Sequence, residues 1–230
     1  MNGLEKLVKN KRVAIIGPSP HLEEKNLGQK IDSYDVVCRI NAISYGDTKD
    51  YGLKTDICFW NLSDSSLNYF RSIIEYSKDE LHKIKLIVCP RHSLHVSPFH
   101  LKNFSPDKNI FNNYKTLNLD KELFHIGNET NERFEKTIGC HPTLGSLVIM
   151  TLLEYDLKEL FIGGISFYQT KARYNQGFIN TMTQMKLKEV ELQYRPPGHN
   201  LQQEIYYFKQ NISKYPFVTG DFYFTKLFLE

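Results

Sequence analysis

Two tyrosines, Tyr168 and Tyr174, stand six positions apart shortly after an apolar run that ends in Gly163-Gly164. A phenolic hydroxyl donates a hydrogen bond and stays neutral at pH 7, so two of them can stabilise negative charge that develops on a departing group. The alternative is that Tyr168 belongs to the core and Tyr174 to an exposed loop. The position after a strand places both tyrosines where α/β proteins bind ligands, beyond the carboxyl ends of the strands.

His199 stands near the predicted start of a helix. It follows the segment RPPG and begins the predicted helix 199–210. The positive end of the helix dipole disfavours an imidazolium, so the ring would stay neutral and could accept a proton from a hydroxyl group. A lone histidine after Pro-Gly is normally a surface or capping residue. Glu204 follows five residues later on a different face of that helix, and we expect a structural or orienting role for it.

Asparagines end two consecutive predicted strands, at Asn41 and Asn61. The side-chain amide offers a donor and an acceptor, which suits recognition of a base, a ribose or a sugar. An asparagine at a strand end is commonly a turn former or a helix cap, and that alternative stays open for each residue taken alone. The repetition at neighbouring strands favours a binding site at this edge.

The segments that must position these residues alternate between strand and helix patterns. Short apolar, β-branched runs predict strands covered on both faces, at 12–17, 35–41, 55–61, 85–90 and 158–165. Apolar spacing or a start signal predicts helices, at 21–31, 66–83, 128–137, 142–157 and 199–210. Residues 91–127 show no decisive pattern. The alternation predicts an α/β fold with one Rossmann-like, mostly parallel sheet and helices on both faces, in a single domain over residues 1–230.

Composition excludes several classes of protein. The net charge is +3 with 24% charged residues, so nothing requires a nucleic-acid partner. The first apolar run, VAIIG, is too short for a signal peptide or a membrane span, which predicts a cytoplasmic protein. The four cysteines contain no CxxC pair, so we expect neither a zinc site nor a disulfide scaffold, but reduced and mostly buried strand residues.

Several segments, taken in order, resemble the motifs of sialyltransferases. The stretch VAIIGPSPHLEEKNLGQKIDSYDVVCRIN is similar to the large sialylmotif of the animal enzymes, glycosyltransferase family 29, and DYGLKTD extends the likeness. HPTLGSLVIMTLLEYDLKELFIGG resembles the small sialylmotif, and HNLQQE a later His-x4-Glu motif. CFWN and GISFYQTKARY look closer to the bacterial lipo-oligosaccharide sialyltransferases of glycosyltransferase family 42. The matches cover nearly the whole chain, from about Arg12 to about Gln210.

The resemblance implies a GT-A-like sialyltransferase fold, with a mobile lid at residues 169–198. It implies an inverting transfer of sialic acid from its CMP ester to a sugar hydroxyl, without a cofactor. No metal is expected, because the chain lacks the Asp-x-Asp pair that holds a divalent ion in metal-dependent glycosyltransferases. The implied partners are a CMP-activated sugar donor and a glycan acceptor such as lipo-oligosaccharide, which would bring the protein to the inner face of the membrane. The bacterial relatives suggest a homo-oligomer.

For the site, the resemblance assigns Tyr168 and Tyr174 to the departing phosphate and His199 to the catalytic base. At Thr143 and Gly145 it places a helix start, where backbone N–H groups favour an anion, although Pro142-Thr143 would start a helix in any case. The positions that match donor-binding residues are Gly17, Ser19, Asn41, Asn61, Thr143, Gly145 and Gly163.

The chain also departs from both families. Pro18 stands where they carry an asparagine, and it offers neither an amide side chain nor a backbone N–H. Leu144 replaces a serine or threonine that reaches the donor's carboxylate, and His141 replaces an arginine of the bacterial family. The histidine-tyrosine motif of the animal family is absent. Val13 and Asp156 stand where the animal enzymes carry the two cysteines of a disulfide between their motifs. These changes leave the donor open between sialic acid, another nonulosonate and Kdo.

Two other classes of function remain to be compared. A CMP-binding protein of the same fold that has lost catalysis would explain Pro18 and Leu144, but it does not explain the joint presence of Tyr168, Tyr174 and His199. A Rossmann-like oxidoreductase is disfavoured, because the chain has no GxGxxG and carries Asn41 where an acidic residue would bind the ribose.

Overall fold

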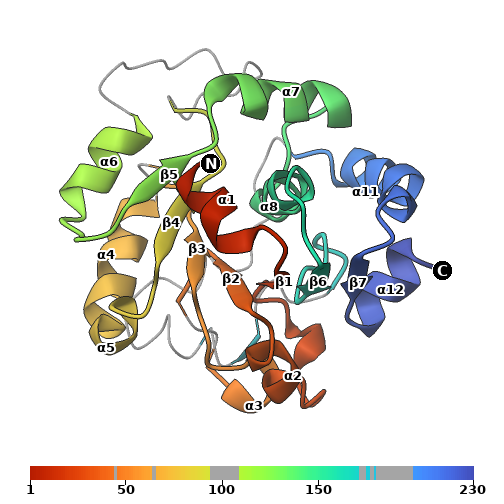
Figure 1. Cartoon of the computed structure of the whole chain (residues 1–230), viewed down its shortest axis with the longest axis horizontal. Helices are drawn as coiled ribbons and strands as arrows, with labels where there is room; N and C mark the ends of the chain where they lie inside the picture. The colour runs from red at the N-terminus through yellow and green to blue at the C-terminus, as the bar shows by residue number, and fades with distance from the viewer. Residues whose placement is uncertain (44–45, 64–65, 94–108, 171–174, 177–178, 180–198) are drawn as a thin grey trace.

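The computed structural model describes the chain except residues 44–45, 64–65, 94–108, 171–174, 177–178 and 180–198. The described residues build a seven-stranded sheet in the order β5-β4-β3-β2-β1-β6-β7 (Figure 1). Every neighbouring pair of these strands runs parallel. The predicted α/β fold with a Rossmann-like sheet is therefore confirmed, and the described sheet is parallel throughout.

The strands form where apolar, β-branched residues follow one another. Parallel strands covered on both faces need such runs, because neither face meets water. Ile15 of the central strand is paired with Cys38 on one side and Ile162 on the other, and all three are fully buried or nearly so. The strands are β1 (Arg12–Ile16), β2 (Val36–Ile40), β3 (Ile57–Phe59), β4 (Leu86–Cys89), β5 (Leu123–His125), β6 (Glu159–Gly163) and β7 (Val218–Gly220).

Helices cover both faces of the sheet, as predicted. Val13 and Ile15 point to one face, where they join a core cluster with residues of five helices. These are α1 (Gly3–Val8), α7 (Asn128–Ile138), α8 (Leu144–Leu153), α11 (Leu201–Asn211) and α12 (Phe222–Phe228). Ala14 and Ile16 point to the opposite face. That face is covered by η1 (Pro20–Leu22), α2 (Gly28–Asp32), α3 (Thr48–Tyr51), α4 (Leu67–Tyr76), α5 (Lys78–Leu81) and α6 (Ile110–Thr116).

The predicted helix 21–31 is wrong as a continuous element. Only η1 and the short α2 form, and between them Glu24 and Asn26 adopt positive φ angles of 63° and 54°. The Asp50 carboxylate accepts hydrogen bonds from both backbone N–H groups, each at 2.7 Å. The Asp50 carboxylate, which is distant in the sequence, thus replaces the hydrogen bonds of the helix that the local apolar spacing favoured.

The other helix predictions hold with smaller differences. The predicted helix 66–83 divides into α4 and α5 at Ser77, whose φ of −113° and ψ of 35° are not helical. The segment without a decisive pattern contains α6 and β5, and the sequence pattern also missed η4 (Ile212–Lys214), β7 and α12. β5 and β7 are three residues each, too short to show a period.

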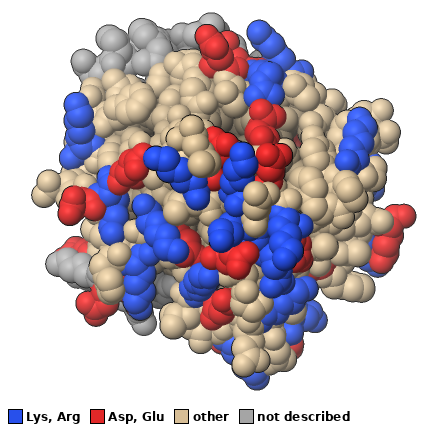
Figure 2. Space-filling model, viewed as in Figure 1, with Lys and Arg blue, Asp and Glu red and all other residues tan. Residues whose placement is uncertain are grey.

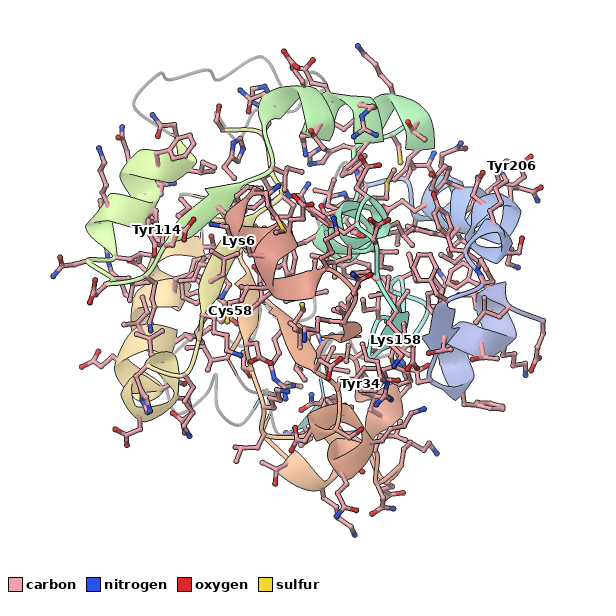
Figure 3. All side chains as sticks on the ribbon, viewed as in Figure 1. Lys6, Tyr34, Cys58, Tyr114, Lys158 and Tyr206 are labelled. Carbon is pink, nitrogen blue, oxygen red and sulfur yellow. The ribbon has the colours of Figure 1, made fainter. Side chains whose placement is uncertain are left out.

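All four cysteines are free and buried, as predicted. Three lie in strands, and Cys58 is visible within the sheet in Figure 3; Cys140 lies outside the strands, shortly before α8. Within the described ranges, no helix has the length and apolar character to cross a membrane, and no group of three His, Cys, Asp or Glu side chains could hold a metal ion. On the face shown in Figure 2, lysines and arginines are interspersed with acidic residues.

Candidate active site at the carboxyl edge of the sheet

The carboxyl ends of the strands form one edge of the sheet. From β1, the chain adds β2 to β5 on one side of the sheet and then β6 and β7 on the other side, so the strand order reverses between β1 and β6. In open α/β sheets, ligands bind at this switch point. A polar or glycine residue follows nearly every strand at this edge. In spatial order these residues are Arg91 after β4, Asn61 after β3, Asn41 after β2, Ser19 after β1, Gly164 after β6 and Asp221 after β7.

Two glycines allow β1 and β6 to meet at the switch point. Gly17 donates its backbone N–H to the Gly163 carbonyl at 2.9 Å. A Cβ on Gly17 would lie 2.4 Å from the Gly164 carbonyl oxygen, and one on Gly164, whose φ is +68°, would lie 2.2 Å from the Gly17 oxygen. Only glycine fits at either position. A Cβ on Gly163 would lie 2.9 Å from the Phe161 ring. The predicted contact between Gly163 and a nucleotide stays a prediction.

The two predicted asparagines lie side by side. The Asn41 side-chain oxygen accepts the backbone N–H of Asn61 at 3.1 Å, and Asn41 itself has a φ of 52°. The Asn61 side-chain oxygen accepts the Ser66 hydroxyl at 2.7 Å. Both side chains are half-buried. The structure therefore brings these two residues together as the sequence predicted, with the amide oxygens used to fix the two loops.

Ser19 belongs to a hydrogen-bonded chain that joins β1 to β7. His21 Nε2 lies 2.8 Å from an Asp221 carboxylate oxygen, and His21 Nδ1 lies 3.0 Å from Ser19 Oγ. Because the carboxylate accepts from Nε2–H, the other ring nitrogen accepts the serine hydroxyl in the neutral tautomer. Asp221 also accepts the backbone N–H of Gly164 and caps α12 through Phe224 N, both at 2.8 Å. These hydrogen bonds hold the loop after β1 against β6 and β7.

Glu204 organises the start of α8. Its Oε2 accepts the backbone N–H of Thr143 at 3.1 Å, the Thr143 hydroxyl at 2.7 Å, and the Ser146 hydroxyl. The side chain is fully buried, and its Oε1 has no hydrogen-bond partner within the described structure. Burial raises the pKa of the Glu204 carboxyl, and the hydrogen bonds from Ser146 and Thr143 oppose that rise. The orienting role expected for Glu204 agrees with this geometry.

Thr143 is the N-cap of α8, because its side chain accepts the Ser146 backbone N–H. Gly145 follows within the first turn, where a Cβ would lie 3.2 Å from the Ile165 side chain. The two residues thus stand at a helix start, as predicted. Their contacts show how the helix start is built, and binding of an anion there stays a prediction.

His199 directly precedes Asn200, the N-cap of α11, as the sequence predicted. Its Nδ1 lies 2.9 Å from the backbone carbonyl of His141. A carbonyl only accepts, so Nδ1 carries the proton and Nε2 carries the lone pair. The His199 ring is stacked on the His141 ring, with centroids 5.2 Å apart and an interplanar angle of 13°. This tautomer is the one a general base needs.

Three residues beside His199 were not among the predicted site residues. Arg91 donates from Nη1 to His141 Nε2 at 2.9 Å and to the Pro142 carbonyl at 2.8 Å. His141 in turn has Nδ1 2.7 Å from the Glu135 carboxylate. The sequence did carry a signal for Arg91, since it directly follows the predicted strand 85–90 and the rule that selected Asn41 and Asn61 applies to it as well.

Tyr168 lies at the same edge, after β6, and is half-buried. Phe167 and Tyr168 both have positive φ angles, 49° and 56°, which are uncommon for residues other than glycine and concentrate at functional sites. Tyr174 lies outside the described residues, as does most of the predicted lid 169–198. Asn175, which is described, donates its backbone N–H to the Pro18 carbonyl at 2.8 Å. The start of the lid segment therefore contacts the loop after β1.

The parallel sheet defines this protein as a Rossmann-like α/β protein, and its polar switch point at the carboxyl edge is the candidate ligand site. A family model described as "Glycosyltransferase family 29 (sialyltransferase)" matches residues 5–155. The chain therefore belongs to the sialyltransferases of glycosyltransferase family 29.

Comparisons with individual proteins agree with this family. The chain is 31% identical over 159 residues to the human beta-galactoside alpha-2,6-sialyltransferase 1, a match that covers 62% of this chain and 38% of that protein. The matched part thus spans well under half the length of this curated relative.

Solved structures of low identity share the fold. The Campylobacter jejuni sialyltransferase Cst-I superimposes with a TM-score of 0.59 at 18% identity, covering 95% of this chain and 79% of that one. CstII from the same organism, in complex with the substrate analogue CMP-3FNeuAc, gives 0.56 at 20% identity, with 91% and 81% covered. A mammalian sialyltransferase gives 0.53 at 14% identity, with 94% and 70% covered.

Proposed function

We propose that this protein transfers sialic acid, or a related nonulosonate or Kdo, from its CMP ester to a sugar hydroxyl, with inversion and without a metal ion. The observation that carries this proposal is the tautomer of His199, because the His141 carbonyl holds the proton on Nδ1 and leaves the lone pair on Nε2. Membership of the sialyltransferase family and the fold shared with structures of CstII in complex with CMP support the choice of donor.

In this mechanism the acceptor hydroxyl attacks the anomeric carbon while His199 Nε2 takes its proton. The bond between that carbon and the CMP phosphate breaks, and the electron pair leaves with the phosphate. Hydrogen bonds from Tyr168 and Tyr174 would stabilise the charge that develops there. The predicted donor contacts include Asn41 and Asn61, whose amide groups suit the nucleoside.

The other parts of the proposal follow from the same site. We propose a single glycosyltransferase domain over residues 1–230, in which 169–198 closes over the donor and limits hydrolysis. The hydrogen bond from Asn175 to Pro18 supports the position of this segment beside the loop after β1. The acceptor would be a surface glycan such as lipo-oligosaccharide.

The experiment is release of CMP from CMP-sialic acid, with CMP-Kdo in parallel, in EDTA and with a lactose-type acceptor. His199→Ala should lower release by about 100-fold or more, because a positioned general base contributes roughly that much, while CMP binding stays within about twofold. His82→Ala is the matched control, since His82 is exposed on the surface after α5. Transfer by His199→Ala at the rate of the parent protein would show that His199 is not the base.

A joint Tyr168→Phe and Tyr174→Phe variant tests the departing phosphate, and an unimpaired rate would remove both tyrosines from the mechanism. Clear binding of CMP without release from either donor would instead favour the CMP-binding protein that has lost catalysis. Pro18 and Leu144 are the residues that would explain such a loss.

A further inference from the structure

Arg91 is a buried cation without a direct carboxylate partner in the described structure. Its side chain is 8% exposed, and no ion pair of Arg91 occurs within the described ranges. A guanidinium stays charged at any physiological pH. Buried charges in proteins are paired with an opposite charge or bind one. The burial of Arg91 therefore calls for an anion.

The neutral groups around Arg91 orient its guanidinium without neutralising it. Nη1 donates both to His141 Nε2 at 2.9 Å and to the Pro142 carbonyl at 2.8 Å. Glu135 lies behind His141, 2.7 Å from its other ring nitrogen. Among the described residues, the side-chain hydrogen bonds of Arg91 use Nη1 alone, so in this part of the chain Nη2 and Nε have donors left for a ligand.

The position of Arg91 also points to a ligand. It stands two residues after β4 at the carboxyl edge of the sheet, where Asn61 and Asn41 follow the next two strands in the sheet, β3 and β2. Its Pro142 contact places it beside the N-terminus of α8, a helix of ten residues whose positive dipole end also favours an anion. The carboxylate at that helix start, Glu204, is already engaged by Thr143 and Ser146.

Two carboxylates lie near Arg91, but neither forms a direct ion pair with it within the described residues. Burial lowers the pKa of the Arg91 guanidinium, and electrostatic interactions with Cys89, Glu204, Tyr168 and Glu135 oppose this effect. Glu135 and Glu204 act on Arg91 from a distance or through His141.

We propose that Arg91 binds an anionic oxygen of the CMP-sugar donor, through Nη2 and Nε. This inference rests on the proposed function, since the donor is the anion that the site would receive. The donor has two anionic groups, the phosphate and the carboxylate of the sugar acid, and both offer the paired oxygens that a guanidinium binds well. Arg91 is therefore a substrate-binding residue, positioned by His141 and by the Pro142 carbonyl.

Calorimetric binding of three probes separates these groups: cytidine carries no anion, CMP carries the phosphate, and CMP-sialic acid carries both. The variants are Arg91→Gln and Arg91→Lys, and Arg133→Gln is the matched control, because Arg133 is exposed and pairs with Glu154 on the surface. Binding of CMP by the parent protein is measured first. A parent that binds no CMP refutes the proposed function itself, independently of Arg91.

We expect Arg91→Gln to weaken binding of the anionic probe by about 10-fold to 100-fold, as loss of a hydrogen bond to a charged group does, and to leave cytidine binding unchanged. Arg91→Lys should recover part of the loss. A loss with CMP and CMP-sialic acid alike assigns Arg91 to the phosphate, and a loss with CMP-sialic acid alone assigns it to the carboxylate. Unchanged binding of both overturns the proposal, and an equal loss with cytidine overturns it in favour of a structural role.

Discussion

Replacing Glu204 by alanine should destabilise the protein strongly, because this side chain holds the start of α8. The change removes one oxygen that accepts three hydrogen bonds, from the backbone and side chain of Thr143 and from Ser146. It leaves the Thr143 backbone N–H without this acceptor in a buried site, and the Thr143 and Ser146 hydroxyls keep only one acceptor between them through their mutual hydrogen bond. Each buried neutral donor that loses its acceptor costs about 1–3 kcal/mol. That is a large share of the roughly 5–15 kcal/mol that stabilises a domain.

Glu204→Gln is the informative second variant. Its amide oxygen can still accept from Thr143 and Ser146, and it removes the cost of burying a charge, so we expect a loss within about 1 kcal/mol at neutral pH. The pKa of Glu204 is raised by burial in the folded protein, so the folded state binds this proton more tightly than the unfolded state does. Stability should therefore fall as pH rises from the ordinary carboxyl pKa, about 4.3, through the raised folded value. The Gln variant should lack this contribution.

Urea denaturation followed by tryptophan fluorescence measures both effects, since Trp60 is the single tryptophan and is fully buried. Glu75→Ala, on the exposed side of α4, is the control and should stay within about 0.5 kcal/mol of the parent protein. If Glu204→Ala is equally neutral, or if Glu204→Gln retains the full fall with pH, then Glu204 does not organise α8 in the way described.

Two further predictions test the switch point and the buried thiols. Gly164→Ala should cost at least about 2 kcal/mol, because its Cβ would lie 2.2 Å from the Gly17 oxygen. Gly127→Ala is the control: its φ is also positive, at +92°, but the nearest neighbour of its Cβ would be 4.0 Å away, so it should cost backbone strain alone, and less than Gly164→Ala. Equal costs in urea denaturation would contradict the close approach of β1 and β6. Burial raises the pKa of all four cysteine thiols, to about 12 for Cys89 and about 11 for Cys140. A disulfide reagent at pH 8 should therefore react with none of the thiols in the folded protein and with all four in urea. Rapid reaction of the folded protein would contradict their burial.

Much of the fold could be predicted from the sequence, because local patterns decide it. The buried strands around Ile15 and Ile162 were recognisable as apolar runs, and the positions of Asn41, Asn61 and His199 followed from where those runs and the helix 199–210 end. The helix predicted at 21–31 failed, since Asp50 supplies hydrogen bonds from outside the segment. β5 and β7 are three residues long and hold their place through pairing with longer strands.

The candidate site was only partly predictable for a similar reason. The residue types at the strand ends could be identified from the sequence. The hydrogen bonds that orient these side chains, however, join distant parts of the chain. His21 and Asp221 are 200 positions apart, and Thr143 and Glu204 are 61 apart. Arg91 reaches His141 across 50 positions. The periodicity of apolar residues along the sequence gives no information about contacts between residues so far apart.

By itself, the sequence determined the strand and helix alternation, the polar residues at the strand ends and the family likeness, because each of these depends on neighbours in the chain or on the order of motifs. Only the tertiary structure decided which tautomer His199 adopts, what holds the start of α8, and that Arg91 is buried beside His141 without a direct carboxylate partner in the described structure. Those properties depend on the distances and the burial that packing creates, and packing exists only once the sheet has assembled.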